Sequence, residues 1–133
     1  MRLFVDTGAW IALADRSDQY HTPAVSVVRH LSAADALYTS NYVMAETVTR
    51  LRRTAGHHVA WRWAHELPQS HLLRVHYADQ ELDAEALHIF HKYADQELSF
   101  TDCVTVALMQ RLHLERVFAF DEDFRKLGYL LVP

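Results

Sequence analysis

The chain is poor in the residues that cross-link a fold or interrupt its helices and strands. Its 133 residues include one cysteine, three glycines and three prolines. The single cysteine, Cys103, excludes an intramolecular disulfide and is typical of a reducing cytoplasm. Because glycine and proline are scarce, long disordered linkers are not expected. We therefore predict one domain over residues 1–133, long enough to bury its own core.

Long apolar runs and an excess of positive charge are also missing. No run approaches the ~20 residues of a membrane helix, and Asp6 and Asp15 interrupt the N-terminal run too early for a signal peptide. The net charge of −4 argues against holding nucleic acid by bulk electrostatics. It leaves open an enzyme that acts on nucleic acid through metal ions. Ten histidines are present but form no HExxH-like ligand motif. We expect a cytoplasmic protein without membrane contact.

Short apolar segments alternate with amphipathic ones along the whole chain. The apolar segments predict strands over residues 3–5, 36–39, 72–75, 116–120 and 129–132. Helices are predicted through residues 10–13 and over residues 23–34, 41–55, 57–67, 84–93, 101–112 and 122–127. Strands that alternate with helices predict an α/β fold with a mainly parallel sheet. Ligands of such sheets bind beyond the carboxyl ends of the strands.

Several helix ends are marked by single residues. Thr22 is the expected N-cap of the second helix, with Pro23 at its first position. Ser40 or Asn41 is expected to cap the third helix, and Gly56 to end it. Ser99 is expected to cap the helix that carries Asp102.

Two aspartates follow strands that are predicted to be parallel. Asp6 comes directly after the buried segment LFV, and Asp121 comes after VFAF. If these strands are neighbours, both carboxylates lie at the edge where such folds bind ligands. An unpaired buried charge is costly, so Asp6 needs either a partner or a chemical role.

Two further acids have simple explanations when each is taken alone. Asp102 lies in the first turn of a helix, where it can complete a cap and is favoured by the helix dipole. Glu46 lies off the apolar face of its helix, on the flank of Arg50 and Arg53, where an i,i+4 ion pair suffices to explain it. Four acids at strand ends and helix starts nevertheless repel one another without a counter-ion. Mg²⁺ and Mn²⁺ take oxygen ligands and serve phosphoryl chemistry, so we interpret the partner of Asp6 as a metal ion.

Four stretches of the chain resemble the PIN domain, in particular the VapC-type toxins of toxin–antitoxin pairs. They are VDTGAWIAL, NYVMAE, SFTDCVTVALM and FAFDEDF, in family order and spanning essentially the whole chain. The resemblance implies a PIN-like α/β/α sandwich and an endoribonuclease that depends on Mg²⁺ or Mn²⁺. It assigns the metal-binding and catalytic quartet to Asp6, Glu46, Asp102 and Asp121.

The resemblance also implies supporting residues around the quartet. Thr7 matches the hydroxyl residue that follows the first acid, Thr101 the residue before the third, and Asp123 an extra acid near the fourth. Many members carry Thr or Ser two residues before the fourth acid, where this chain has Ala119. That departure removes a hydroxyl beside Asp121.

Partners follow from the same resemblance. It implies an RNA substrate, a VapB-type antitoxin whose C-terminal segment wraps the toxin, and a homodimer. We expect the antitoxin to bury apolar residues against the early helices, near Trp10, Ile11 and Tyr20. Arg50 and Arg53 either hold RNA phosphate or form part of a solvated face.

Other functions stay open at this point. A free-standing RNA-processing nuclease of the PIN type would carry the same acids. A degenerate PIN domain that only binds a partner is kept open by Ala119. Phosphatases that form an aspartyl-phosphate also place Asp after the first strand, but they usually carry a second Asp two residues later, where this chain has Gly8.

Overall fold

Five parallel strands form one sheet, in the order β3-β2-β1-β4-β5. The structure, a computed structural model, describes residues 1–133. The strands are β1 (Arg2–Val5), β2 (Ala36–Ser40), β3 (Leu73–His76), β4 (Arg116–Phe118) and β5 (Leu130–Val132). The predicted α/β fold with a parallel sheet is therefore confirmed.

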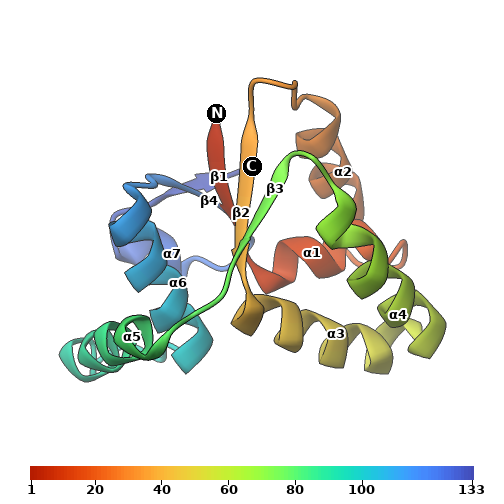
Figure 1. Ribbon diagram of the computed structural model, residues 1–133. Helices are drawn as coiled ribbons and strands as arrows, with labels where there is room; N and C mark the ends of the chain where they lie inside the picture. The colour runs from red at the N-terminus through yellow and green to blue at the C-terminus, as the bar shows by residue number, and fades with distance from the viewer.

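Helices cover both faces of this sheet. They are α1 (Thr7–Ala14), α2 (His21–Arg29), α3 (Asn41–Ala55), α4 (His57–Glu66), the 3-10 turn η1 (Leu67–Gln69), α5 (Gln80–Lys92), α6 (Phe100–Leu112) and α7 (Asp123–Lys126). Figure 1 shows α1 to α4 on one side of the strands and α5, α6 and α7 on the other. The molecule is thus an α/β/α sandwich. None of its helices combines the length and the apolar character needed to span a bilayer.

The core is built around the central strand and α6. Leu3, Phe4 and Val5 of β1 have no exposed surface, because strands lie on both sides of β1 and helices cover both of its faces. Residues 103–109 of α6 are all buried. Both elements lead directly to an acid, Asp6 after β1 and Asp102 at the start of α6. Two of the most deeply buried parts of the fold therefore position these two carboxylates.

The predicted bounds of the second helix were wrong at both ends. The helix begins at His21, so Thr22 is not its N-cap and Pro23 is its third residue. Proline is tolerated there because the first turn lacks backbone acceptors for its N–H groups. The helix ends at Arg29 rather than Ala34. The Asp35 carboxylate accepts the N–H of Ser32 at 2.7 Å, which favours a turn before β2.

Other boundaries agree with the sequence or move by a few residues. Ser40 caps α3 by accepting the N–H of Val43 at 3.2 Å, and Gly56 ends it with a φ of 95°. The helix α5 begins at Gln80, before the predicted Ala84, because Asp79 accepts the N–H of Leu82. The strand β3 lies one residue later than predicted. The strand β4 ends at Phe118 rather than Phe120, so two residues separate it from Asp121.

Candidate metal centre

Asp6 stands where β1 ends and α1 begins. Its backbone N–H donates to the carbonyl of Phe118 in β4 at 3.0 Å, and its carbonyl accepts from Ala9 and Trp10 of α1. The Asp6 side chain makes no helix-cap hydrogen bond and no ion pair, although the residue is only 8% exposed. The strand-to-helix junction thus holds an uncompensated carboxylate at the surface of the core.

Asp121, Glu46 and Asp102 reach the same region from three other elements. Asp121 follows β4, the parallel neighbour of β1. Glu46 lies in the second turn of α3. Asp102 lies in the first turn of α6, where it completes a capping box with Ser99: the Ser99 N–H donates to its Oδ2, and its own N–H donates to Ser99 Oγ, both at 3.0 Å. The predicted cap at Ser99 is confirmed.

The charges of the four acids act on one another. Burial is the main reason that the pKa of Asp6 rises to about 7, and the charges of Asp102, Glu46 and Asp121 raise it further. The nearby Thr7 amide counteracts part of this rise. Burial also raises the pKa of Asp102, and the charges of Asp121 and Glu46 contribute. The fold therefore brings the four predicted acids within electrostatic reach of one another.

Three of the four acids are each held through one oxygen and keep the other free. Asp102 accepts the Ser99 N–H through Oδ2, and Asp121 accepts the Asp123 N–H through Oδ1 at 2.9 Å. Glu46 accepts a hydrogen bond from Arg50 through Oε1. No three His, Cys, Asp or Glu side chains already share the geometry of a metal site. The second oxygens make no hydrogen bond within the chain, so they remain available to a cation.

The surroundings of Asp6 fit a hard divalent cation. The hydroxyl of Thr7 is buried and has no hydrogen-bond partner. An unpartnered hydroxyl beside an uncompensated carboxylate is unusual in a native fold. Oxygen donors of this kind, in a site rich in carboxylates, suit Mg²⁺ or Mn²⁺ better than a soft metal.

The other residues of the predicted site differ in their placement. Asp123 begins α7, and burial and the Asp121 charge raise its pKa. Thr101 is half-buried in the first turn of α6. Ala119 is buried, and its backbone N–H donates to the Val132 carbonyl at 3.2 Å. Cys103 is fully buried, and burial raises the pKa of its thiol, which makes it a poor nucleophile.

A polar hollow of about 290 Å³ opens beside Asp6. Its lining residues are Asp6, Gly8, Ile11, Asp18, Gln19, Tyr20, Arg50, Phe120 and Asp121. Arg50 belongs to this lining and Arg53 does not, so the structure separates two arginines that the sequence put on one flank. Asp18, Gln19 and Tyr20 come from the α1–α2 loop, and nothing in the local sequence indicated that this loop reaches the acids.

The expectation that Trp10 and Ile11 offer apolar surface was wrong. They are 3% and 4% exposed, because α1 packs against α2 and α3. Tyr20 is 40% exposed, but its ring stacks on Phe120 with centroids 4.4 Å apart at the mouth of the polar hollow. Tyr20 therefore belongs to the acid site.

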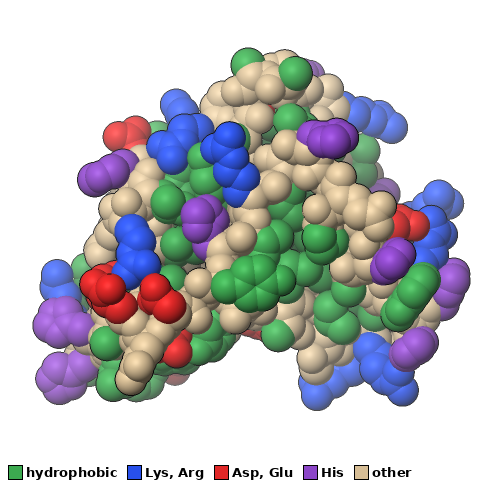
Figure 2. All heavy atoms as spheres, in the orientation of Figure 1, with side chains coloured by type: hydrophobic (Ala, Val, Ile, Leu, Met, Phe, Trp, Pro, Cys, Tyr) green, Lys and Arg blue, Asp and Glu red, His purple; other side chains and the backbone are tan.

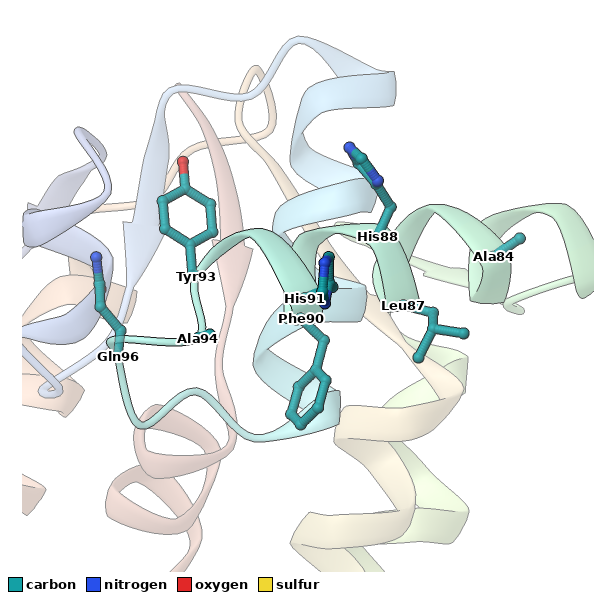
Figure 3. Close-up of a pocket in the computed structure, with 8 residues that line it drawn as sticks. All are labelled: Ala84, Leu87, His88, Phe90, His91, Tyr93, Ala94 and Gln96. Atoms are coloured by element: carbon teal, nitrogen blue, oxygen red, sulfur yellow. The ribbon is translucent and has the colours of Figure 1, made fainter.

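A larger hollow lies on α5 and carries no comparable chemistry. It measures about 740 Å³ and follows the outer side of α5 and the turn after it. Figure 3 shows Leu87 and Phe90 projecting from this helix, with His88 and His91 beside them. The wall is mainly apolar.

Known proteins resemble this chain over nearly its full length. The family model of the PIN domain matches residues 3–129. The 23S rRNA-specific endonuclease VapC20 of Mycobacterium tuberculosis is 32% identical over 130 residues, which cover 98% of this chain and 97% of that protein. The VapC ribonuclease of Archaeoglobus fulgidus is 24% identical over 127 residues, 93% of this chain and 80% of that one.

Solved structures agree with this relationship. The crystal structure of M. tuberculosis VapC20, described as a sarcin–ricin loop cleaving toxin, has a TM-score of 0.89 at 30% identity and covers 96% of each chain. VapBC-1 of nontypeable Haemophilus influenzae has a TM-score of 0.68 at 15% identity, covering 98% of this chain and 96% of that one; this likeness shows the fold alone. The predicted resemblance is confirmed, and the chain belongs to the PIN domain family.

Proposed function

We propose that this protein is an endoribonuclease that uses Mg²⁺ or Mn²⁺, and that it is the toxin of a type II toxin–antitoxin pair. The observation that carries the nuclease proposal is Asp6: a buried carboxylate without an ion-pair partner, whose pKa is raised to about 7 beside three other acids. A bound cation would neutralise such a cluster and relieve the repulsion between its acids. The printed functions of VapC20 and of the A. fulgidus protein support RNA as the substrate.

Asp6, Glu46, Asp102 and Asp121 would hold the cation, with Thr7 and Asp123 in supporting roles. When bound, the cation activates a water molecule and stabilises the negative charge that builds on the scissile phosphate. Ser99 keeps Asp102 oriented through the capping box, and the Asp123 amide does the same for Asp121. Thr101 precedes Asp102 and has a supporting role by resemblance alone.

Arg50 is the residue best placed to hold the substrate. It lines the polar hollow together with Asp6 and Asp121, and its contact to Glu46 is a long one, 3.5 Å, between two solvent-accessible side chains. Such a pair is weak, so the guanidinium is free to turn toward an RNA phosphate. Arg53, three residues further along α3, does not line the hollow and is the weaker candidate.

The substrate proposed by similarity is 23S rRNA, at the sarcin–ricin loop. The similarity to VapC20 covers the whole PIN domain at about one-third identity. Target choice depends on surface residues as well as on the four acids. The proposed RNA target is therefore independent of the proposed metal-dependent cleavage by the four acids.

An antitoxin is the proposed protein partner, and an apolar cleft is available for it. The cleft has a volume of about 330 Å³ and lies between α1, α2, α4 and the sheet. Its wall includes Trp10, Val28 and Trp63, and Val28 is 39% exposed. The cleft suits the apolar side of a short helix that folds on binding.

A second copy of the chain is the proposed partner of α5. Its outer side exposes Leu87 by 59% and Phe90 by 48%, although its inner side already packs on α6. A helix with two apolar sides is normally covered on both. In two copies related by a two-fold axis, the outer side of α5 in each copy would cover that of the other.

Incubation of the purified chain with 23S rRNA tests the proposed function. We expect cleavage at one site with Mg²⁺ or Mn²⁺ and none with EDTA, mapped by primer extension. Cleavage of many unrelated RNAs without site preference would support an RNA-processing nuclease over a specific toxin. Metal-independent cleavage, or none under any condition, would contradict the nuclease proposal.

A further inference from the structure

Two arginines converge on one buried tyrosine near the β3 edge of the sheet. Arg74 Nη1 of β3 donates to the Tyr38 hydroxyl of β2 at 2.8 Å, and Arg2 Nε of β1 donates to the same oxygen at 3.3 Å. Both guanidinium carbons also lie over the Tyr38 ring, 5.2 Å from its centroid for Arg2 and 5.6 Å for Arg74. Tyr38 is 3% exposed, whereas both arginines reach solvent.

No carboxylate neutralises this pair. Neither Arg2 nor Arg74 takes part in any salt bridge of the chain. Two like charges held on one phenol repel each other, and a hydroxyl offsets this less than an anion does. Arg74 uses one of its five N–H donors here, and Arg2 uses two, counting the Leu112 carbonyl at 3.1 Å. Most of the donors are therefore free for a ligand.

The surface around the pair is open and carries aromatic groups. The strand β3 is an edge strand, and Leu73 packs against the core while Arg74 lies on the other face. His76, two residues on, stacks on Tyr38 with centroids 5.8 Å apart, and Tyr77 is 75% exposed. Figure 2 shows Arg or Lys side chains and a histidine over the upper part of the sheet on this face. Arginine beside exposed aromatic rings is the composition of single-strand nucleic-acid surfaces.

We propose that Arg74 and Arg2, held by Tyr38, bind a phosphate of the RNA substrate at a second site outside the four-acid centre. Tyr77 offers a stacking surface for an adjacent base. The site rests on the proposed ribonuclease function, because that function supplies a polyanionic substrate. Strand register pairs Arg74 with Tyr38 and Tyr38 with Phe4, two residues before Asp6. Arg2 is the first residue of β1, so this second site extends toward the amino ends of the strands, away from the four acids.

The test compares two arginine variants with the same change in net charge. Arg74→Gln removes the proposed phosphate ligand, and Arg29→Gln removes an exposed arginine at the end of α2. Binding of a labelled RNA hairpin with the sarcin–ricin sequence is followed by fluorescence anisotropy in EDTA at several salt concentrations. We expect Arg74→Gln to weaken binding about tenfold and to lower the salt slope by about one. Arg29→Gln should leave both close to wild type.

Two further variants separate binding from structure. Arg74→Lys keeps the positive charge but cannot make a bidentate contact with phosphate. It should therefore retain most of the wild-type salt slope. Tyr38→Phe removes the oxygen that holds both guanidiniums. It should weaken RNA binding but change the salt slope less than Arg74→Gln does. In cleavage assays with Mg²⁺, Arg74→Gln should raise KM much more than it lowers kcat.

The outcomes distinguish this site from the proposed function itself. If the wild type cuts the hairpin but Arg74→Gln binds RNA as well as Arg29→Gln does, the second site is wrong and the nuclease stands. If Arg74→Gln weakens only the antitoxin complex, the surface binds protein and the RNA site is wrong. If the Arg74-dependent binding is seen but no cleavage occurs, the site stands and the proposed activity is wrong.

Discussion

Arg50 Nη1 lies 3.5 Å from Glu46 Oε1, one turn away on α3, and the same Arg50 side chain lines the hollow that contains Asp6 and Asp121. The Arg50 guanidinium thus lies between Glu46 of the proposed metal centre and the space where a phosphate would enter. A weak, solvent-accessible ion pair allows the guanidinium to change partner at little cost.

The first prediction concerns Arg50 and its neighbour Arg53. Arg50→Ala should weaken RNA binding about tenfold and reduce its salt dependence by about one unit of slope, because one phosphate contact is lost. Arg53→Ala carries the same charge change outside the hollow and serves as the matched control. Anisotropy titrations over a range of salt concentrations measure both. Equal effects of the two variants would show that Arg50 acts only through its general positive charge and makes no specific phosphate contact.

The second prediction concerns the acids. Asp6→Asn and Asp102→Asn should each reduce metal-dependent RNA cleavage by at least a hundredfold, because a ligand of the proposed cation is lost. Each should leave the circular dichroism spectrum unchanged. Asp95→Asn, at an exposed position after α5, is the control. Wild-type cleavage rates in either acid variant would mean that the quartet does not bind the catalytic metal.

The third prediction concerns pH and the metal-free protein. The folded state raises the pKa of Asp6 from 3.8 to about 7, so it binds this proton more tightly than the unfolded chain does. The resulting stability is complete below about pH 4 and is lost as the pH rises to about 7. The free energy of unfolding should fall by up to about 1.4 kcal/mol per pH unit in this window.

Urea unfolding in EDTA between pH 4 and 8 measures this dependence. Asp6→Asn cannot ionise, so it should flatten the profile and unfold at a higher urea concentration than the wild type at pH 8. Added Mn²⁺ should stabilise the wild type more at pH 8 than at pH 5, because it competes with the proton for the same carboxylate. A wild-type profile with the same slope as that of Asp6→Asn would show that Asp6 is not the titrating group.

The fourth prediction concerns the apolar cleft and the antitoxin. Expression of the chain alone should stop growth, and co-expression with its proposed antitoxin should restore it. Val28→Asp puts a charge into the cleft and should weaken the complex at least tenfold. Ser26→Asp puts the same charge on an exposed position of α2. Co-purification and titration of the two variants compare them, and equal affinities would exclude the cleft as the docking surface.

The fifth prediction concerns the outer side of α5. Leu87→Ser with Phe90→Ser should convert a dimer of 15.4 kDa chains to monomers, because the pair is the most exposed apolar group of that helix. Leu130→Ser is the control, since Leu130 is 56% exposed on another element. Light scattering after size exclusion gives the mass. A dimer that survives the double change would place the interface elsewhere.

The sequence by itself determined the order of the elements and singled out four acids as the proposed metal ligands. The alternation of LFV, ALYT and VFAF with amphipathic segments is a local property, because side-chain periodicity follows backbone geometry. Capping at Ser40 and Ser99 and the helix end at Gly56 are local as well, since each depends on bonds within a few residues. The PIN resemblance then joined acids from four separate stretches.

Only the tertiary structure decided which neighbours those acids have. Packing across the sheet brought Asp18, Gln19 and Tyr20 to the acids and left Arg53 outside, although Arg50 and Arg53 share a helix flank. It buried Trp10 and Ile11, which periodicity alone could not orient, because α1 is apolar on nearly every side. It also brought Arg2, Tyr38 and Arg74 together from three strands. Contacts between residues distant in sequence depend on strand order and register, and no local pattern encodes these.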